Sequence, residues 1–399
     1  MSDVGTLKTP PNRLVSADVR FVFSGDSDGS SEFGNFEVLN EVLYEEPDFF
    51  VYNGDTVYPD INVNGENEAL SRYREAYKMN RDLDALRDLL KMTSTFAIWD
   101  DHEILDDYDG QTVDPFLYLN GRKAFLEYMP ILERRFRIRD PDCAGDPLFR
   151  VFHWGKDVDI IILDERSCRS ADVESACLIE ISPGVFIPDP APTLPPLLRQ
   201  ESQLQIPENP PPGCLEAIFD PTRTMLGHVQ KWLLKAVLLF SRAKFKFVIN
   251  EVPIQQLYAF PYDRWEGYGA ERIGILSFIR LSHIKNVIFL TTDTHANIIN
   301  EVFIDRFFAP QPIAYEFVTG PIARTTLEQA LLVQEDELGL PVLEAFVSIL
   351  DGLLGVDCHE LDAFSYGLVE VDATAGTATI TLKDEEGAML PGCTKTIGP

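Results

Sequence analysis

Six short apolar runs, rich in Val, Ile and Phe, recur along the chain and limit the folds open to it. Each run has the length and composition of a strand that is buried on both faces. The runs cover residues 19–25, 48–53, 94–99, 158–164, 244–250 and 285–291. Helical periodicity between the runs predicts helices over residues 36–45, 67–91, 116–134, 225–242 and 270–284. Because strands alternate with helices, the sequence predicts an α/β fold.

Three segments fall outside this alternation. Residues 1–18 precede the first run and are expected to form an N-terminal extension. Residues 171–222 are rich in proline and show little periodicity, which indicates a long surface insertion beside the core. Residues 366–383 alternate apolar and polar side chains around a turn that contains glycine, and this pattern predicts a C-terminal β-hairpin.

The charge of the chain restricts its partners. There are 64 acidic and 34 basic residues, so the net charge is −30. A surface this negative repels phosphate backbones, and we expect no nucleic acid duplex as a partner. No window approaches the roughly 18 uninterrupted apolar residues of a transmembrane helix, so no membrane span is expected. The first residues show neither the apolar core of a signal peptide nor a twin-arginine signal.

The cysteines leave the redox environment open. Their spacing includes no CxxC pair and no pattern typical of zinc sites. An even number permits disulfides without requiring them; the six are Cys143, Cys168, Cys177, Cys214, Cys358 and Cys393. A secreted enzyme without its signal peptide would have the same features, and that alternative stays open. Nothing in the sequence predicts the oligomeric state.

Polar residues gather directly after four of the apolar runs. The four loops are Gly25-Asp26-Ser27-Asp28-Gly29, Asn53-Gly54-Asp55-Thr56-Val57-Tyr58, Trp99-Asp100-Asp101-His102-Glu103 and Thr292-Asp293-Thr294-His295-Ala296-Asn297. Ligands of α/β sheets bind outside the carboxyl ends of the strands, so we expect these loops to converge. Four carboxylate-bearing loops at one edge repel each other unless cations neutralise them, which predicts a metal centre.

The ligand types narrow the choice of metal. Of the six histidines only His102 and His295 lie in these loops, so oxygen donors dominate. Carboxylates and a phenolate with one imidazole suit Fe(III), Mn or Ca better than a structural zinc. The spacing of Asp55 and Tyr58 allows both side chains to reach one ion across a tight turn. The alternative is that each aspartate caps a helix or an Asx-turn, but their joint placement favours the metal centre.

Eight separated motifs resemble the alkaline phosphatase D (PhoD-like) branch of the calcineurin-like metallophosphoesterases, which are related to the purple acid phosphatases. The motifs are FVFSGDS, FFVYNGDTVYPD, TFAIWDDHEILDDYDG, VDIIILDERSCR, LGHVQKWLLKAV, FKFVINEVPIQ, YDRWEGYGAER and VIFLTTDTHAN. They occur in the family order and cover roughly residues 18–383. The resemblance implies a four-layer α-β-β-α sandwich and one catalytic domain over residues 19–399. It also implies an extracellular or periplasmic location.

The resemblance assigns metal ligands residue by residue. It implies that Asp55 bridges metal ions, that Tyr58 is a phenolate ligand of Fe(III), and that His295 also binds the iron. Asp293 would bind the neighbouring ion, which would be calcium in this branch. Asp101 and Asp107 occupy positions where relatives carry a metal-binding Asn.

Three positions depart from the family pattern. Thr291-Thr292 replaces a Ser-Gly or Gly pair before Asp293. Asp26 stands where related enzymes often place a cysteine, which makes the expected iron ligand set harder. Asn250 stands where many metallophosphoesterases use a metal-binding histidine, so the second metal should be more oxygen-rich. Fe(III) and Ca²⁺ are the expected cofactors, with Mn and Zn as alternatives.

The expected reaction is hydrolysis of small phosphodiesters or phosphomonoesters by a metal-bound hydroxide at this Fe/Ca-type cluster. His102 would protonate the leaving oxygen or stabilise it with a hydrogen bond. Arg166, after the fourth apolar run, would offer planar donors to phosphate oxygens; the alternative for it is a buried ion pair with Asp164 or a neighbouring loop. The rival function is a calcium-stabilised binding or scaffold protein without catalysis. A metal-dependent nuclease would need a basic groove, and the sequence predicts none.

Overall fold

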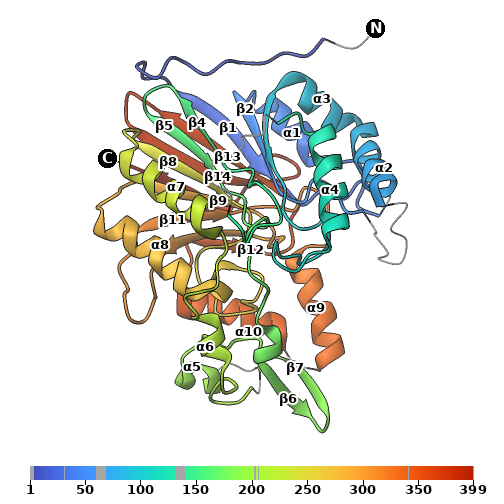
Figure 1. Cartoon of the computed structure of the whole chain (residues 1–399). Helices are drawn as coiled ribbons and strands as arrows, with labels where there is room; N and C mark the ends of the chain where they lie inside the picture. The colour runs from blue at the N-terminus through green and yellow to red at the C-terminus, as the bar shows by residue number, and fades with distance from the viewer. Residues whose placement is uncertain are drawn as a thin grey trace.

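Two β-sheets packed face to face form the centre of the computed structural model, and helices cover both outer faces (Figure 1). The structure describes residues 4–30, 32–59, 69–131, 140–201, 204, 206–339 and 341–398. The α/β four-layer sandwich expected from the resemblance is therefore confirmed. The division at residue 18 stays a prediction.

The first sheet contains three of the predicted strands. Its members are β1 (Val19–Ser24), β2 (Phe49–Asn53), β3 (Ser94–Ile98), β13 (Ser365–Asp372), β14 (Thr377–Asp384) and β15 (Met389–Ile397), in the order β15-β14-β13-β1-β2-β3. Strands β1, β2 and β3 are parallel. The predicted hairpin is β13 with β14, and β15 extends it into an antiparallel meander.

The second sheet contains the other three predicted strands. Its members are β4 (Arg150–Trp154), β5 (Val158–Ile162), β8 (Phe245–Asn250), β9 (Val287–Thr291), β10 (Asn297–Val302), β11 (Ala314–Val318) and β12 (Cys358–Glu360), in the order β12-β10-β11-β9-β8-β5-β4. Strands β5, β8, β9 and β11 are parallel. Phe21 of β1 meets Phe247 of β8 edge to face at a ring-centroid distance of 5.2 Å, so the two sheets share an aromatic core.

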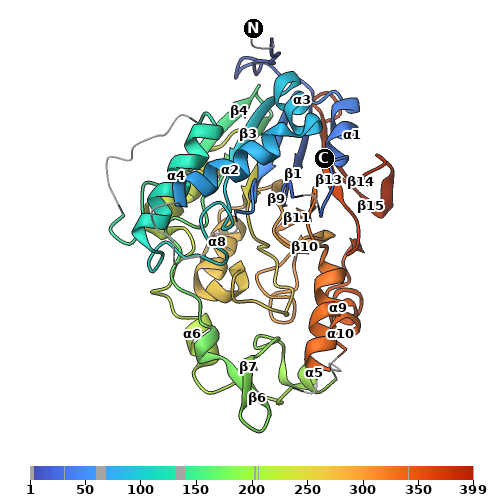
Figure 2. The same cartoon turned by 90° about the vertical axis from the view of Figure 1, so that its right-hand side faces the viewer.

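Helices cover the two outer faces because each presents an apolar stripe to a sheet. Those over the first sheet are α1 (Val38–Tyr44), α2 (Ala69–Asp82), α3 (Asp84–Met92) and α4 (Pro115–Tyr128), and Figure 2 views the molecule from their side. Those over the second sheet are α7 (Gly227–Phe240) and α8 (Gly269–Leu281).

Two of the helix predictions need correction. The helix predicted over 67–91 is two helices, because Leu83 has an extended backbone (φ −72°, ψ 126°) that separates α2 from α3. The helix predicted over 116–134 ends earlier, since α4 stops at Tyr128. Residues 67–68 and 132–134 of these predictions lie outside the described residues.

The predicted insertion holds short elements of its own. They are η2 (Glu174–Ala176), β6 (Leu178–Ser182), β7 (Val185–Pro188), α5 (Pro196–Glu201) and α6 (Cys214–Ile218). Four further elements lie outside the insertion, later in the chain: η3 (Trp265–Tyr268), α9 (Leu327–Leu338), α10 (Val342–Ser348) and η4 (Ile349–Leu354). Strands β6 and β7 form a separate hairpin that protrudes at the bottom of Figure 1. Ala191 and Leu194 share an apolar cluster with Phe346 and Leu350, so the insertion packs against the α9–η4 segment.

The six cysteines form three disulfides, which the sequence had left open: Cys143–Cys168, Cys177–Cys214 and Cys358–Cys393. The bond between Cys358 of β12 and Cys393 of β15 joins the two sheets covalently. None of the helices in the described parts of the chain has the length and apolarity that a membrane crossing requires.

Candidate metal centre

The predicted loops meet at one edge of the sandwich. They follow the carboxyl ends of parallel strands in both sheets, namely β1, β2 and β3 in one and β9 in the other. Asn53 Nδ2, at the end of β2, donates to the backbone oxygens of Asn250 (3.0 Å) and Leu290 (3.3 Å) across the sandwich. The amide of Asp293 donates to Asp26 Oδ1 (3.2 Å). The expected convergence at the carboxyl ends is thus present.

The backbone is strained at most of the expected ligands. Five of them have left-handed φ angles, a conformation that costs about 1 kcal/mol or more for residues with a Cβ; they are Asp26 (57°), Asp55 (48°), Asp107 (54°), Asp293 (64°) and His295 (54°). Gly54 (φ 77°) lets two loops approach closely, since a Cβ there would lie 2.8 Å from the Cβ of Asp100. Strain of this kind concentrates at functional sites, because the surrounding structure must hold it.

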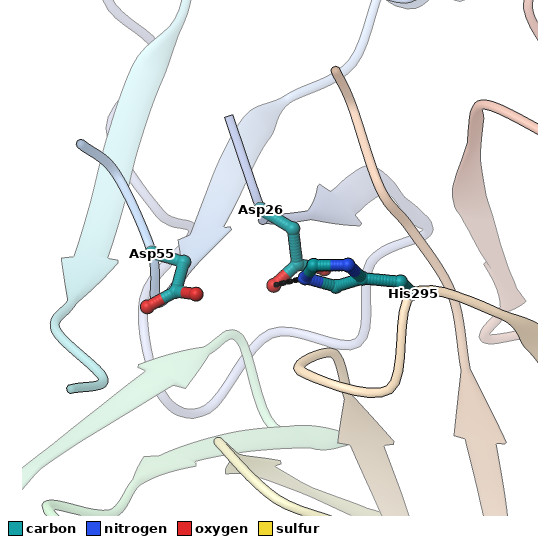
Figure 3. A group of neighbouring side chains, drawn as sticks. All are labelled: Asp26, Asp55 and His295. Carbon is teal, nitrogen blue, oxygen red and sulfur yellow. Dashed lines mark ion pairs between the residues drawn. The ribbon is translucent and has the colours of Figure 1, made fainter. Parts of the chain in front are cut away.

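Asp26, Asp55 and His295 form the first group of possible ligands (Figure 3). One ligand atom from each lies within 4.8 Å of the others. Tyr58 Oη donates to Asp55 Oδ2 (2.6 Å) and lies 3.3 Å from His295 Nε2, so the phenol lies beside this group, and its role as a ligand stays a prediction. His295 Nδ1 is 2.6 Å from the Thr325 carbonyl oxygen, which leaves Nε2 for a metal ion.

Two further groups continue this arrangement. Asp55, Asp101 and His102 form the second group, and Asp101, Asp107 and Asp263 form the third. Asp55 belongs to the first two groups and Asp101 to the last two, so the three groups form one continuous row. A carboxylate shared between neighbouring groups is the arrangement that a metal-bridging ligand needs.

Asp293 and His102 lie beside this row. Asp293 belongs to none of the three groups, and its carboxylate is 3.9 Å from Arg166 Nη2, so its role as a ligand stays a prediction. The amide of His102 donates to Asp55 Oδ1 (3.3 Å), and its ring packs 4.2 Å from the ring of Tyr58. His102 Nε2 lies 3.2 Å from Asp106 Oδ1, and the side chain is 27% exposed. Its ring is therefore accessible at the edge of the centre.

Arg166 is fully buried and bonded to carboxylates. Its Nε donates to Asp100 Oδ1 (2.5 Å), while Nη1 and Nη2 donate to the two oxygens of Asp263 (2.7 Å each). The alternative of a buried ion pair is thus present, although its side-chain partners are Asp100 and Asp263 rather than Asp164. The expected contact of Arg166 with a phosphate oxygen stays a prediction.

The chemistry of the row fits bound cations. Among the described residues, Asp26 Oδ2 and Asp100 Oδ2 are buried without a hydrogen-bond partner. Burial, and next the neighbouring carboxylates, raise the pKa of Asp26 and of Asp55 well above the usual range. Burial lowers the pKa of His295 to about 4, so its imidazole is neutral, the form that binds metal. A cation would offset the cost of burying these carboxylates together.

Comparison with known proteins identifies the family. A family model described as PhoD-like phosphatase matches residues 21–378. The chain belongs to the PhoD-like phosphatase family.

A curated relative and a solved structure are also similar to this chain. The PhoD-like chain is 25% identical over 341 residues to alkaline phosphatase D of Bacillus subtilis (strain 168), covering 76% of this chain and 51% of that protein. It therefore spans about half the length of that relative. A solved structure titled "Structure of PhoD" matches with a TM-score of 0.70 and 18% identity, over 100% of this chain and 75% of the other, which supports the fold.

Two residues at this PhoD-like centre, Asp263 and Glu103, were not assigned a role from the sequence. Asp263 lies in the family motif YDRWEGYGAER but follows no predicted strand, and it reaches the row from the long segment after β8, so it was not assigned as a ligand. Glu103 is buried and accepts hydrogen bonds from Thr56 N (2.7 Å), Thr56 Oγ1 (2.7 Å) and Asp100 N (2.9 Å). It ties the loop after β2 to the loop after β3, and the only signal for it was its place directly after His102.

Proposed function

We propose that this PhoD-like protein is a metal-dependent hydrolase of phosphodiesters, phosphomonoesters or both. The observation that carries the proposal is the continuous row of three ligand groups that share Asp55 and Asp101 at the carboxyl edge of both sheets. Membership of the PhoD-like phosphatase family, and the similarity to alkaline phosphatase D, support phosphoric esters as the substrate class.

The donor types support particular metals at the two ends of the row. Asp26, Asp55, Tyr58 and His295 would hold Fe(III), because hard oxygen donors with one imidazole suit that ion. The oxygen-only group around Asp107 suits Ca²⁺, with Mn and Zn as alternatives for the cluster. Bound ions would supply an activated water nucleophile and would stabilise charge on the phosphoryl oxygens.

His102 and Arg166 have separate roles in this proposal. The ring of His102 is accessible and belongs to the second ligand group of the row, so His102 would donate a proton to the leaving oxygen. Arg166 would position Asp100 and Asp263 and offset part of the negative charge around the row. A direct contact between Arg166 and the substrate would require these pairs to open.

The charge of the chain supports a small substrate, and its disulfides support an oxidising location. A net charge of −30 disfavours a nucleic acid duplex, so a small phosphate ester is the expected substrate. Three disulfides are typical of oxidising compartments, which supports an extracellular or periplasmic location.

Hydrolysis of p-nitrophenyl phosphate and bis-p-nitrophenyl phosphate tests the proposal, together with elemental analysis of the purified protein. Asp55→Asn should lower kcat at least about a hundredfold and reduce the metal content, because a bridging carboxylate is lost. Asp220→Asn is the matched control, since Asp220 serves an exposed turn by accepting from Thr222. Full activity of Asp55→Asn with unchanged metal would contradict the proposal. Metal-stabilised folding without turnover of either ester would instead support the calcium-stabilised scaffold.

A further inference from the structure

We propose that Arg324 binds the phosphoryl oxygens of the substrate at the Tyr58 side of the metal centre. The inference rests on the proposed function, because it assumes that a phosphate ester is bound there. Nothing in the sequence pattern singled out Arg324, since it follows no predicted strand and lies outside the eight family motifs.

The backbone of the Arg324 segment is fixed to the loop of Asp26. The amides of Ile322 and Ala323 donate to the carbonyl oxygens of Gly25 (2.9 Å) and Asp26 (3.1 Å). The amide of Asp28 donates back to the carbonyl oxygen of Ala323 (2.8 Å). These three bonds hold the residue before Arg324 in register with the first expected ligand.

The side chain of Arg324 lies beside the first ligand group. Its guanidinium carbon is 4.4 Å from the ring centroid of Tyr58 and 5.2 Å from that of Phe33. Tyr58 Oη in turn contacts both Asp55 and His295. The cation therefore packs on the ring of Tyr58, an expected iron ligand that contacts two others.

Arg324 is far more exposed than Arg166 and Arg169, the two buried arginines near the row. Arg166 and Arg169 are buried, and their guanidinium groups bond to carboxylates or to backbone oxygen. The Arg324 side chain is 31% exposed, and its ion pair with Asp28 Oδ2 (2.8 Å) uses Nη1. Nε and Nη2 have no hydrogen-bond acceptor among the described residues, so they are able to meet a phosphoryl oxygen.

The chemistry of this position suits a phosphate anion. A planar guanidinium forms two parallel hydrogen bonds with phosphate oxygens, and Arg324 supplies positive charge on a chain whose net charge is −30. Contact with two rings and with Asp28 restricts the rotamers of the side chain, which lowers the entropy lost when a substrate binds.

The test measures binding of inorganic phosphate by calorimetry, and KM and kcat for both nitrophenyl esters, on the protein as purified with its metals. Arg324→Ala should weaken phosphate binding by about ten- to hundredfold and raise KM similarly, since charged hydrogen bonds are lost. Arg324→Lys keeps the charge without the planar fork and should recover part of the affinity. Arg306→Ala is the matched control, because the Arg306 guanidinium lies 4.5 Å from the Phe303 ring beyond the opposite end of β10.

The outcomes separate this inference from the proposed function. Unchanged phosphate affinity in Arg324→Ala, within about twofold, would overturn the inference whatever the activity. Loss of metal from both Arg324 variants would also overturn it, because Arg324 would then support the centre instead of the substrate. A wild type that binds phosphate through Arg324 but hydrolyses neither ester would refute the proposed function alone.

Discussion

At the scale of residues, two buried glutamates, Glu165 and Glu251, are expected to make the stability of the protein depend on pH. The amide of Glu165 donates to Glu251 Oε2 (2.9 Å), and Glu165 Oε2 accepts from Val252 N (3.0 Å). Burial raises the pKa of Glu165 to about 7. Burial, and next the charge of Glu165, raise the pKa of Glu251 well above its usual range. Both carboxyl groups therefore bind protons more tightly in the folded chain than in the unfolded chain.

This pair predicts that stability falls as the pH rises. The contribution of a carboxyl group with a raised pKa is complete below the unfolded pKa and is lost as the pH passes the folded pKa. Glu251→Gln replaces the protonated form with a neutral amide. Its free energy of unfolding relative to wild type should therefore rise by about 1–3 kcal/mol between pH 5 and pH 8. Urea unfolding at both pH values measures this difference.

An exposed glutamate provides the control for that experiment. Glu370 forms a surface ion pair with Arg20, so Glu370→Gln should change stability by less than about 1 kcal/mol at either pH. If the effect of Glu251→Gln is equal at pH 5 and pH 8, the two buried glutamates do not control the pH dependence.

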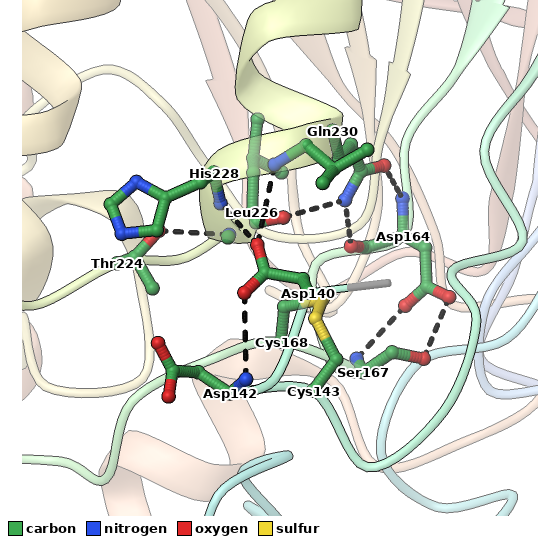
Figure 4. The surroundings of a disulfide bond; sticks show 12 residues. Asp140, Asp142, Cys143, Asp164, Ser167, Cys168, Thr224, Leu226, His228 and Gln230 are labelled. Atoms are coloured by element: carbon green, nitrogen blue, oxygen red, sulfur yellow. Dashed lines mark hydrogen bonds between the residues drawn. A yellow bond between two sulfur atoms is a disulfide. The ribbon is translucent and has the colours of Figure 1, made fainter. Parts of the chain in front are cut away.

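At the scale of elements, the N-terminus of helix α7 is capped by the side chain of Asp140, which comes from a segment distant in the sequence. Asp140 Oδ2 accepts from the amides of His228 (2.5 Å) and Val229 (3.2 Å). Figure 4 shows Asp140 and His228 beside the Cys143–Cys168 disulfide. These amides lie in the first turn of α7 and have no acceptor within the helix. A carboxylate there also interacts favourably with the helix dipole.

Asp140→Ala should therefore destabilise the protein by about 1–2 kcal/mol, the usual cost of losing an N-terminal cap. The midpoint of urea unfolding checks this value. Asp142→Ala is the neighbouring control, because Asp142 contributes its backbone amide, not its carboxylate, to the bond with Asp140. A decrease of equal size in both variants would show that the cap is not the cause.

The predicted elements differ in how well the sequence signalled them. Strands β2, β5, β8 and β9 are buried at every residue, so their apolar runs were visible. Strand β4 is half-buried along its middle, and β10 carries polar residues within Asn297–Val302, so neither produced an apolar run. Their place in the sheet comes from pairing with neighbours, which a local pattern does not contain.

At the scale of the whole molecule, the Cys358–Cys393 disulfide crosses between the two sheets. It closes a loop of 35 residues, and a cross-link of that size stabilises by about 3–4 kcal/mol in the chain-entropy model. The Cys358→Ser/Cys393→Ser double variant should show a lower Tm by several degrees, and both nitrophenyl esters should still be hydrolysed at 25 °C.

Calorimetry and peptide mapping under non-reducing conditions test this cross-link. Mapping of the wild type should recover the Cys358–Cys393 peptide pair. An unchanged Tm in the double variant, with the wild-type bond confirmed, would mean that packing between the sheets already supplies the constraint.

The candidate centre was predictable to the extent that its ligands follow apolar strands. Asp26, Asp55 and His295 follow β1, β2 and β9, and these parallel strands place them together. The rule of strand ends did not reach Asp263, because this residue comes to the row from a segment that follows no strand within two residues, although it lies in a family motif. The partners of Arg166 were equally hidden, since Asp100 and Asp263 are 66 and 97 residues away from it.

The sequence by itself determined the strand and helix alternation, the acidic loops and the family, because these depend on local periodicity and on motifs in order. Only the tertiary structure decided which carboxylates share a group, how the cysteines pair and where Arg324 lies. Six cysteines allow 15 pairings, and the packing of distant segments of the chain selects one of them. Contacts between distant segments depend on how the whole chain packs, which no local pattern records.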